Sequence, residues 1–301
     1  MINIFKNKAN EKTYGDNFLS KVASLLIHAA KIDEVYTAEE KEIIKQTLIK
    51  LGAKASSIEN IIAEAIINEK NSNQILDFTR EIKKRSDSDK IEVIEHCFKL
   101  DNFKNVTEEE ISVLKKKHGI PENKIIVGTI SRYVKLKGID YVIQAFKEVQ
   151  KTSPKIHLLL SNSGGNYEDI IRSKLNELPQ DSYTEIKFEP NLYALYSVLD
   201  IFCHVPINSK VEAYGQTYVE ALAAGVPSIY TLSGIANDFI KHENNALVVD
   251  YKSSRQIADA IQRLLSDNEL RNKLIKNGQE SVQRFDLPIM IEKLERLYLS
   301  Q

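Results

Sequence analysis

The chain has 301 residues, with 41 lysines and arginines against 42 aspartates and glutamates, and 43% of its residues are hydrophobic. This near-neutral balance does not favour a nucleic-acid partner, because binding a polyanion usually needs an excess of basic charge. No apolar run approaches the roughly 20 residues that cross a bilayer, and the amino terminus lacks the apolar stretch of a signal peptide. We therefore expect a cytoplasmic protein of two domains.

The first hundred residues are predicted to be helical. None of the seven prolines and only two of the eleven glycines occur there, so few residues break a helix. Apolar residues recur at helical spacing, which predicts four or five short helices. His28 falls in the first stripe and is expected in the core, and both Cys97 and Cys203 are expected to be free, buried thiols. The apolar stripes cover 18–29, 43–51, 58–66, 75–82 and 93–98.

After Gly119 the pattern changes to short apolar runs separated by helical segments. Runs that are apolar throughout are typical of strands buried on both faces of a parallel sheet, so we expect an α/β doubly wound parallel sheet. Such sheets bind ligands at the carboxyl ends of their strands. The last 50 residues, from Ser253, predict two or three helices, the last of them amphipathic. The predicted strands are 125–130, 156–161, 185–189, 201–205, 228–231 and 246–249.

Two motifs follow the first two predicted strands. Arg132 and Lys137 come after the first strand, and Gly138 begins the next helix. Two cations near a helix amino terminus suit a diphosphate, although a pair of solvated surface charges explains the motif equally well. Gly164 and Gly165 follow the second strand and allow either a tight turn or the close approach of a ligand to the backbone.

Further candidate residues surround the segment VEAYGQTYVEALAAGVP. Gly215 can open a helix, which would leave the amides of Gln216 and Thr217 free to bind an anion. Glu212 precedes this helix and Glu220 lies within it, so these carboxylates can accept hydrogen bonds from sugar and ribose hydroxyls. Two further polar residues lie next to the fourth predicted strand and are interpreted as structural: Asp200 as a local cap and His204 as a buried or capping histidine.

In combination, residues 101–301 resemble the carboxyl-terminal, donor-binding domain of family 4 glycosyltransferases of the GT-B fold. The resemblance rests on GTISRYVKLKG, EAYGQTYVEALAAGVP and LYSVLDIFCHVP. It implies that Arg132 and Lys137 hold a donor diphosphate, that the backbone from Gly215 to Thr217 binds phosphate, and that Glu212 and Glu220 bind the donor sugar and the ribose. The chain departs from the family pattern at Ser131, Ala213 and Ile207, which makes tight positioning of the sugar less certain.

Residues 1–100 resemble the helical TerB-like tellurite-resistance domain, on the segments FLSKVASLLIHAAKIDEVYTAEEKEIIKQTL and ILDFTREIKKRSDSDKIEVIEHCF. The resemblance implies a metal-binding role for Asp33, Glu39 and Glu40, but Glu34 replaces the family's glycine. The alternative is a capping box, with Thr37 as N-cap and Glu40 three residues later. The junction near residue 100 fits either a second TerB-like acidic segment or the lead-in to a GT-B domain.

These resemblances leave two functions open. The first is a retaining glycosyltransferase that takes a nucleotide sugar as donor, needs no metal or cofactor, and lacks the acceptor domain of a complete GT-B enzyme. The second is a non-catalytic TerB-like protein that senses a metal or a partner and carries a nucleotide-binding domain; a chimeric gene product is a third reading. The acceptor, a partner chain that carries the acceptor domain and peripheral contact with a membrane all stay open.

Overall fold

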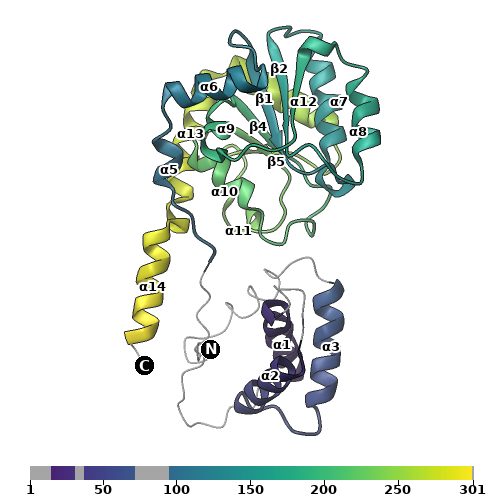
Figure 1. Ribbon diagram of the computed structural model, residues 1–301, viewed down its shortest axis with the longest axis vertical. Helices are drawn as coiled ribbons and strands as arrows, with labels where there is room; N and C mark the ends of the chain where they lie inside the picture. The colour runs from purple at the N-terminus through teal and green to yellow at the C-terminus, as the bar shows by residue number, and fades with distance from the viewer. Residues whose placement is uncertain (1–14, 31–36, 72–94, 300–301) are drawn as a thin grey trace. The chain divides into compact units, whose positions relative to one another are not determined.

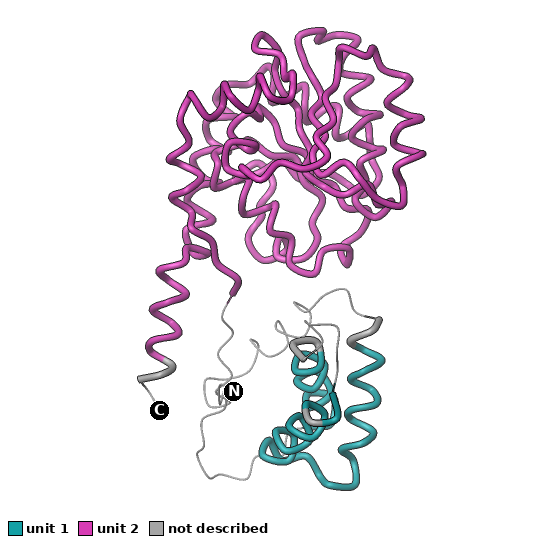
Figure 2. Tube along the Cα trace, viewed as in Figure 1, with its two compact units in different colours: residues 1–94, 297–301 teal, residues 95–296 magenta. Residues whose placement is uncertain are grey.

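The computed structural model describes residues 15–30, 37–71 and 95–299, which belong to two compact units (Figures 1 and 2). One unit comprises residues 1–94 with 297–301, and the other comprises residues 95–296. The helices within the described ranges are all too short or too polar to span a bilayer.

The smaller unit is helical over the residues that the structure describes. Its helices carry three of the predicted apolar stripes and pack these stripes into a core that includes Leu19, Ile44 and Ile62. The stripe at 75–82 and the side chain of His28 lie outside the described residues. The helices are α1 (Asp16–Ala30), α2 (Ala38–Lys50) and α3 (Ile58–Asn71).

Helix α2 begins with the expected capping box. The Thr37 N–H donates to Glu40 Oε2 at 2.8 Å, and the Glu40 N–H donates to Thr37 Oγ1 at 3.2 Å. The two side chains therefore satisfy free amides at the start of the helix reciprocally: Glu40 that of Thr37, and Thr37 that of Glu40. Asp33, Glu34 and the side chain of Glu39 lie outside the described residues.

The larger unit is built on a six-stranded parallel sheet in the order β3-β2-β1-β4-β5-β6. The strand order reverses between β1 and β4, which makes the unit doubly wound, as expected. The third strand lies earlier than the predicted 185–189, because its ladder with β2 ends at the pair Ser161 and Ile186. The strands are β1 (Ile125–Ile130), β2 (Ile156–Ser161), β3 (Tyr183–Ile186), β4 (Ile201–His204), β5 (Ser228–Tyr230) and β6 (Leu247–Val248).

Helices cover both faces of this sheet (Figure 1). Helices α7, α8 and α12 lie on one face, and α6, α9 and α10 lie on the other. Three helices follow the sheet at the carboxyl terminus, as predicted. The helices are α5 (Asp101–Lys104), α6 (Glu108–His118), α7 (Ile139–Gln150), α8 (Glu168–Leu175), α9 (Leu192–Ser197), α10 (Gln216–Ala223), α11 (Ala236–Phe239), α12 (Ser254–Ser266), α13 (Asn268–Ser281) and α14 (Leu287–Leu299), with short 3-10 turns η2 (Lys135–Lys137), η3 (Gln180–Ser182) and η4 (Gln283–Phe285).

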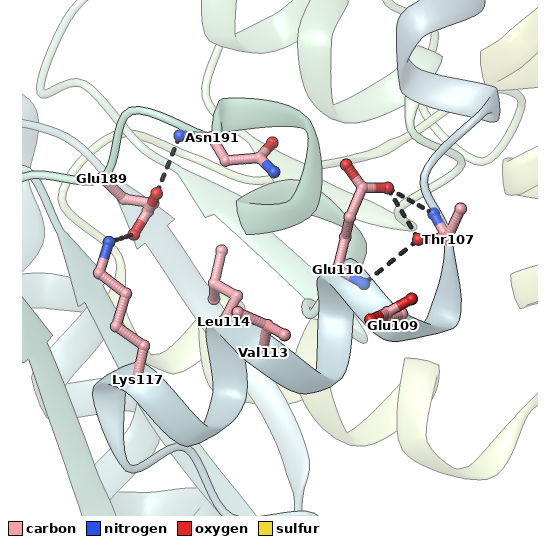
Figure 3. Close-up of a pocket in the computed structure, with 8 residues that line it drawn as sticks. All are labelled: Thr107, Glu109, Glu110, Val113, Leu114, Lys117, Glu189 and Asn191. Atoms are coloured by element: carbon pink, nitrogen blue, oxygen red, sulfur yellow. Dashed lines mark hydrogen bonds and ion pairs between the residues drawn. The ribbon is translucent and has the colours of Figure 1, made fainter.

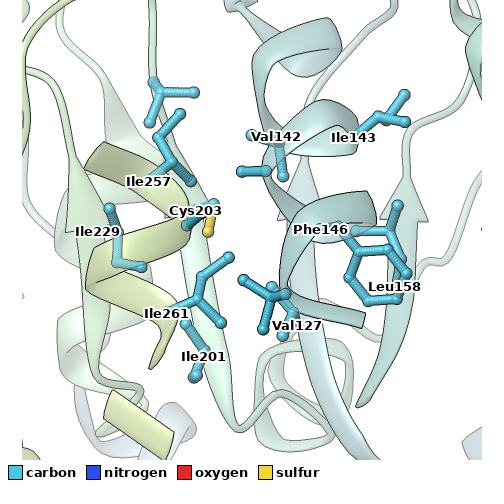
Figure 4. Packing of buried hydrophobic residues seen from close by; sticks show 14 of the residues in the cluster. Val127, Val142, Ile143, Phe146, Leu158, Ile201, Cys203, Ile229, Ile257 and Ile261 are labelled. Carbon is cyan, nitrogen blue, oxygen red and sulfur yellow. The ribbon is translucent and has the colours of Figure 1, made fainter. Parts of the chain in front are cut away.

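The main core lies between the sheet and the face covered by α7 and α12 (Figure 4). Val127 of β1, Phe146 of α7 and Ile261 of α12 are fully buried there. Cys203 of β4 joins this core as a free thiol, and burial raises its pKa to about 12. Full burial of a valine, isoleucine or phenylalanine side chain stabilises the fold by about 2 kcal/mol. This apolar layer therefore fixes the strands, whose carboxyl ends carry the loops.

The segment 95–98 is not helical and forms an isolated β-bridge at Phe98, so the prediction of a helix over Cys97 and Phe98 is wrong. The Phe98 N–H donates to the Phe285 carbonyl, and the Leu287 N–H donates to the Phe98 carbonyl, both at 2.8 Å. Glu95 forms an ion pair with Arg284 at 2.6 Å. These contacts hold the segment against the residues between α13 and α14, and helical backbone would break them.

Helix α14 extends from the α/β body as a single helix (Figure 1). Its apolar residues Ile289, Met290 and Leu294 are half-buried, and Ile291 is exposed. The described part of this helix thus leaves an apolar stripe partly open to solvent.

Candidate functional site

Residues that follow β1, β2 and β4 line an open pocket of about 300 Å³ at the carboxyl edge of the sheet. The pocket lies where the strand order reverses, the place where open α/β sheets bind ligands. Its lining consists of Ile130, Ser131, Arg132, Lys137, Asn162, His204 and residues 212–217.

Glycine backbones bring the loops around this pocket close together. Gly138 has a φ of 70°, and a Cβ there would lie 2.2 Å from the Val205 carbonyl oxygen, so the turn after Lys137 can pass β4 only as glycine. Gly165 has a φ of 147°, and a Cβ there would lie 2.4 Å from the carbonyl oxygen of Tyr133. Gly165 therefore allows the close approach of its own backbone to the backbone of Tyr133.

The two cations predicted for the first loop both line the pocket. Lys137 donates from Nζ to Glu212 Oε1 at 2.6 Å. Arg132 is exposed and forms no ion pair with any residue in the described ranges. Its guanidinium is thus free to meet an anionic ligand.

Glu212 is a buried carboxylate with two donors on one oxygen. Its Oε1 lies 2.6 Å from Lys137 Nζ and 3.0 Å from His204 Nε2. Burial raises the pKa of Glu212, but the hydrogen bond from His204 and the charge of Lys137 outweigh burial and lower this pKa to about 2. Glu212 is therefore ionised at neutral pH and acts as an acceptor.

The amino terminus of α10 forms another wall of the pocket. Gly215 precedes it with a φ of 92°, and the first N–H groups of a helix have no partners within the helix. Two side-chain hydroxyl oxygens of the lining, Ser131 Oγ and Thr217 Oγ1, are buried and have no hydrogen-bond partner among the described residues. Buried polar groups are nearly always paired, so these hydroxyls indicate a ligand that accepts hydrogen bonds.

Glu220 lies on α10 but does not line the pocket. It is buried, and the Tyr196 hydroxyl donates to its Oε2 at 2.9 Å. Burial raises the pKa of Glu220, and the hydrogen bond from Tyr196 opposes this rise only in part. The structure thus brings Arg132, Lys137, Glu212 and 215–217 together in one lining, and Glu220 is not part of that lining.

A second pocket, of about 290 Å³, lies between α6 and the segment before α9 (Figure 3). Glu189 is buried in its wall, where Lys117 Nζ and His118 Nε2 each lie 2.7 Å from its Oε2. The N–H of Asn191 donates to its Oε1 at 2.9 Å. Burial raises the pKa of Glu189, but the hydrogen bonds from Lys117 and His118 outweigh it and lower this pKa to about 2. This cluster ties α6 to the loop that follows β3.

Two polar residues near β4 do more than the sequence indicated. Asp200 accepts from the Ile126 N–H at 2.8 Å through Oδ2, so it joins β4 to β1 and is not a local cap. His204 lines the pocket and contacts Glu212, although the sequence favoured a purely structural histidine. Asn162 also lines the pocket and was missed; its position directly after a predicted strand was the available signal.

Comparison with known proteins identifies the α/β unit. Residues 110–281 match the family model for glycosyl transferases group 1, which is more than half of the chain. The chain belongs to the glycosyl transferases group 1 family. Residues 19–114 match the model for the tellurite resistance protein TerB, so both resemblances seen in the sequence are confirmed.

The relatives of this group 1 member are longer than the chain itself. The chain is 25% identical over 252 residues to an N-acetyl-alpha-D-glucosaminyl L-malate synthase of Bacillus anthracis, a match that covers 83% of this chain and 61% of that protein. It spans about half the length of several other curated relatives.

Solved structures of group 1 and GT-B proteins share the fold. The carboxyl-terminal domain of LpcC, a group 1 glycosyl transferase of Francisella tularensis, is 25% identical with a TM-score of 0.56, and the match covers 63% of this chain and 99% of that one. Anabaena HepE in complex with UDP-glucose is 18% identical with a TM-score of 0.66, and the match covers 98% of both chains.

The described part of this group 1 chain contains no group of three or more histidines, cysteines, aspartates or glutamates arranged to hold a metal ion. In the TerB-matching region, Glu40 of the predicted metal-binding residues is described, and its carboxylate forms the capping box with Thr37. The two family matches overlap at 110–114, on α6, and α6 packs against α9 within the α/β unit.

Proposed function

We propose that this chain binds a nucleoside-diphosphate sugar in the pocket between β1 and β4, and that it transfers the glycosyl group, with retention, to an acceptor. The two buried hydroxyls without partners, Ser131 and Thr217, carry this proposal, because they lie in the same lining as Arg132 and Lys137. A diphosphate supplies acceptors for the hydroxyls and negative charge for the cations. The family match and the HepE structures with UDP and UDP-glucose support a nucleotide sugar as donor.

Catalysis in this proposal is electrostatic. Negative charge builds on the diphosphate as the glycosyl bond breaks, and cations and helix amides that already contact the bound diphosphate stabilise that charge. Arg132, Lys137 and the amino terminus of α10 supply these groups. Glu212 accepts hydrogen bonds from the sugar hydroxyls, and Glu220 accepts from the ribose hydroxyls. The resemblance to the family is the support for retention and for the role of Glu220.

The acceptor site is proposed to lie on a further domain. The chain spans about half the length of several relatives, and α14 carries a partly open apolar stripe. A second candidate function, in which the α/β unit binds a nucleotide without turnover, accounts for the same pocket lining. The two functions differ in one measurable property, because only the first predicts sugar transfer or donor hydrolysis.

Calorimetric titration of the whole chain with UDP, GDP and ADP, each with and without Mg²⁺, tests the donor site. We expect one nucleotide to bind, and we expect Arg132→Ala to weaken its binding at least about tenfold, because a charge-assisted contact to phosphate is lost. Arg172→Ala is the matched control, since Arg172 is on α8, pairs with Glu168 and does not line the pocket. Failure of a folded chain to bind any of the three nucleotides would contradict both functions.

A further inference from the structure

His204 is a buried group that the proposed roles do not use. It lies at the carboxyl end of β4 with only 3% of its surface exposed. The Phe202 ring lies nearly parallel to the imidazole, with centroids 6.3 Å apart, and the Tyr218 ring meets it edge-on at 4.8 Å. These two rings limit rotation of the imidazole, so its Nε2 stays directed at Glu212.

The contact between His204 and Glu212 has a defined polarity. Glu212 is ionised and can only accept, so the hydrogen lies on His204 Nε2 and is donated to Glu212 Oε1 at 3.0 Å. The Glu212 N–H donates to Ser233 Oγ at 2.9 Å, which fixes the backbone at this point. Glu212 Oε2 has no hydrogen-bond partner among the described residues. The carboxylate thus has one oxygen held and one oxygen available in the pocket lining.

Lys137 and His204 both contact Glu212 Oε1, but the contact from Lys137 is the more easily broken of the two. Lys137 has a flexible stem and a side chain that is 20% exposed, whereas the His204 side chain is 3% exposed. A bound diphosphate carries more negative charge than one carboxylate, so it draws the Lys137 ammonium toward itself. The bond from His204 is then the remaining contact that orients Glu212.

We propose that His204 is a positioning residue for the donor sugar. It holds Oε1 of Glu212 while Lys137 engages the diphosphate, so that Oε2 stays directed at the sugar hydroxyls. This inference rests on the proposed function, and it adds that recognition of the sugar depends on an imidazole that itself contacts neither sugar nor phosphate.

The test compares the affinity for a nucleoside diphosphate with the affinity for its sugar ester. The whole chain and its variants are titrated with UDP and UDP-glucose, and with the pairs GDP and GDP-mannose and ADP and ADP-glucose. His204→Leu has a similar volume but no donor, and we expect it to weaken the sugar nucleotide about tenfold and the diphosphate less than about twofold. His204→Gln offers an N–H at a similar reach, so it should recover most of the lost affinity.

His157→Leu is the matched control. His157 is also a buried histidine of the sheet, but it lies near the amino end of β2, contacts Thr184 Oγ1 and does not line the pocket. It should leave both affinities unchanged. Circular dichroism confirms that each variant is folded, and His204→Ala, which also lacks a donor, replaces the leucine variant if that one is not folded.

Equal losses for the sugar nucleotide and the diphosphate, or no loss for either, would overturn the positioning role. So would a glutamine variant that is folded but binds the sugar nucleotide as weakly as the leucine variant. A wild-type chain that binds none of the six ligands is a separate result, because it contradicts the proposed function before any variant is made.

Discussion

Glu212 and Glu220 are both buried, eight residues apart, yet the structure gives them opposite electrostatic settings. Glu212 receives hydrogen bonds from Lys137 and His204, which lower its pKa to about 2. Glu220 receives one from the neutral Tyr196 hydroxyl, and burial raises its pKa. The first carboxylate is therefore ionised throughout the neutral and mildly acidic range, whereas the second gains a proton at a higher pH than an ordinary carboxyl does.

Nucleotide affinity should depend on pH through Glu220. If Glu220 binds the ribose as proposed, the ribose hydroxyls donate to its ionised carboxylate, and affinity should weaken as the pH falls through the raised pKa of Glu220. Tyr196→Phe removes the hydrogen bond that opposes the rise, so it should move this loss of affinity to a higher pH. Calorimetric titration with the preferred nucleotide between pH 5 and 8 measures the effect.

Glu220→Gln is the control for this pH dependence, because an amide does not titrate in this range. Protonation of the nucleotide itself affects the wild type and the variant equally, so the comparison isolates Glu220. The same pH profile in both proteins would show that Glu220 does not bind the nucleotide as a titrating carboxylate.

The sequence located some residues of the pocket but not their contacts. Arg132, Lys137 and Glu212 could be placed in loops because the carboxyl ends of parallel strands meet at one edge of the sheet. The bond between His204 and Glu212 depends on how the loop after β4 folds back, and no spacing in the sequence encodes that distance. The unpaired hydroxyls of Ser131 and Thr217 could not be predicted for the same reason.

Among the helices and strands, the predicted bounds are most accurate for the strands that are buried along nearly their whole length. The runs at 125–130 and 156–161 became β1 and β2 with the same bounds, because both strands are buried on both faces. The predicted bounds of the edge strand β3 are too late in the sequence, because Phe188 has the apolar character of a strand residue. In the structure Phe188 lies beyond the end of the ladder and is 72% exposed. The segment 95–98 was misread because its partners, residues 285–287, lie far away in the sequence.

Glu189 should stabilise the attachment of α6 in a pH-dependent way. Its pKa falls from an ordinary value of 4.5 to about 2, so its contribution is fully present above about pH 4.5 and is lost between pH 4.5 and 2. We expect Glu189→Gln to lower the free energy of unfolding by about 1 to 2 kcal/mol at pH 7 and by much less near pH 3. Urea denaturation at several pH values measures this difference.

Glu122→Gln provides the matched control on a neighbouring ion pair. Glu122 pairs with Lys115 of α6 at 3.3 Å, but its side chain is 58% exposed, and exposed pairs contribute little to stability. A destabilisation by Glu189→Gln that is as large at pH 3 as at pH 7 would mean that packing, and not the charge cluster, accounts for it.

In the molecule as a whole, the segment 95–98 connects the start of the α/β unit to its pocket. The Tyr214 hydroxyl donates to the His96 carbonyl at 2.9 Å, and Gln216 Nε2 lies 2.9 Å from His96 Nε2. Tyr214 and Gln216 both line the pocket. The segment therefore supports the pocket wall from behind, although the sequence placed it in the helical domain.

Two fragments should separate the roles of the helical unit and of this segment. A fragment of residues 95–301 keeps these contacts, so we expect it to fold and to bind the preferred nucleotide as tightly as the whole chain. A fragment of residues 101–301 lacks the Glu95–Arg284 ion pair, the Phe98 backbone pairing and the His96 contacts. We expect it to melt at least about 5 °C lower and to bind the nucleotide more weakly, because the loop at 214–216 loses its support.

Thermal unfolding measures the melting temperature of each fragment, and calorimetric titration measures its nucleotide affinity. Weaker binding by the 95–301 fragment than by the whole chain would instead assign a role in nucleotide binding to the TerB-matching unit.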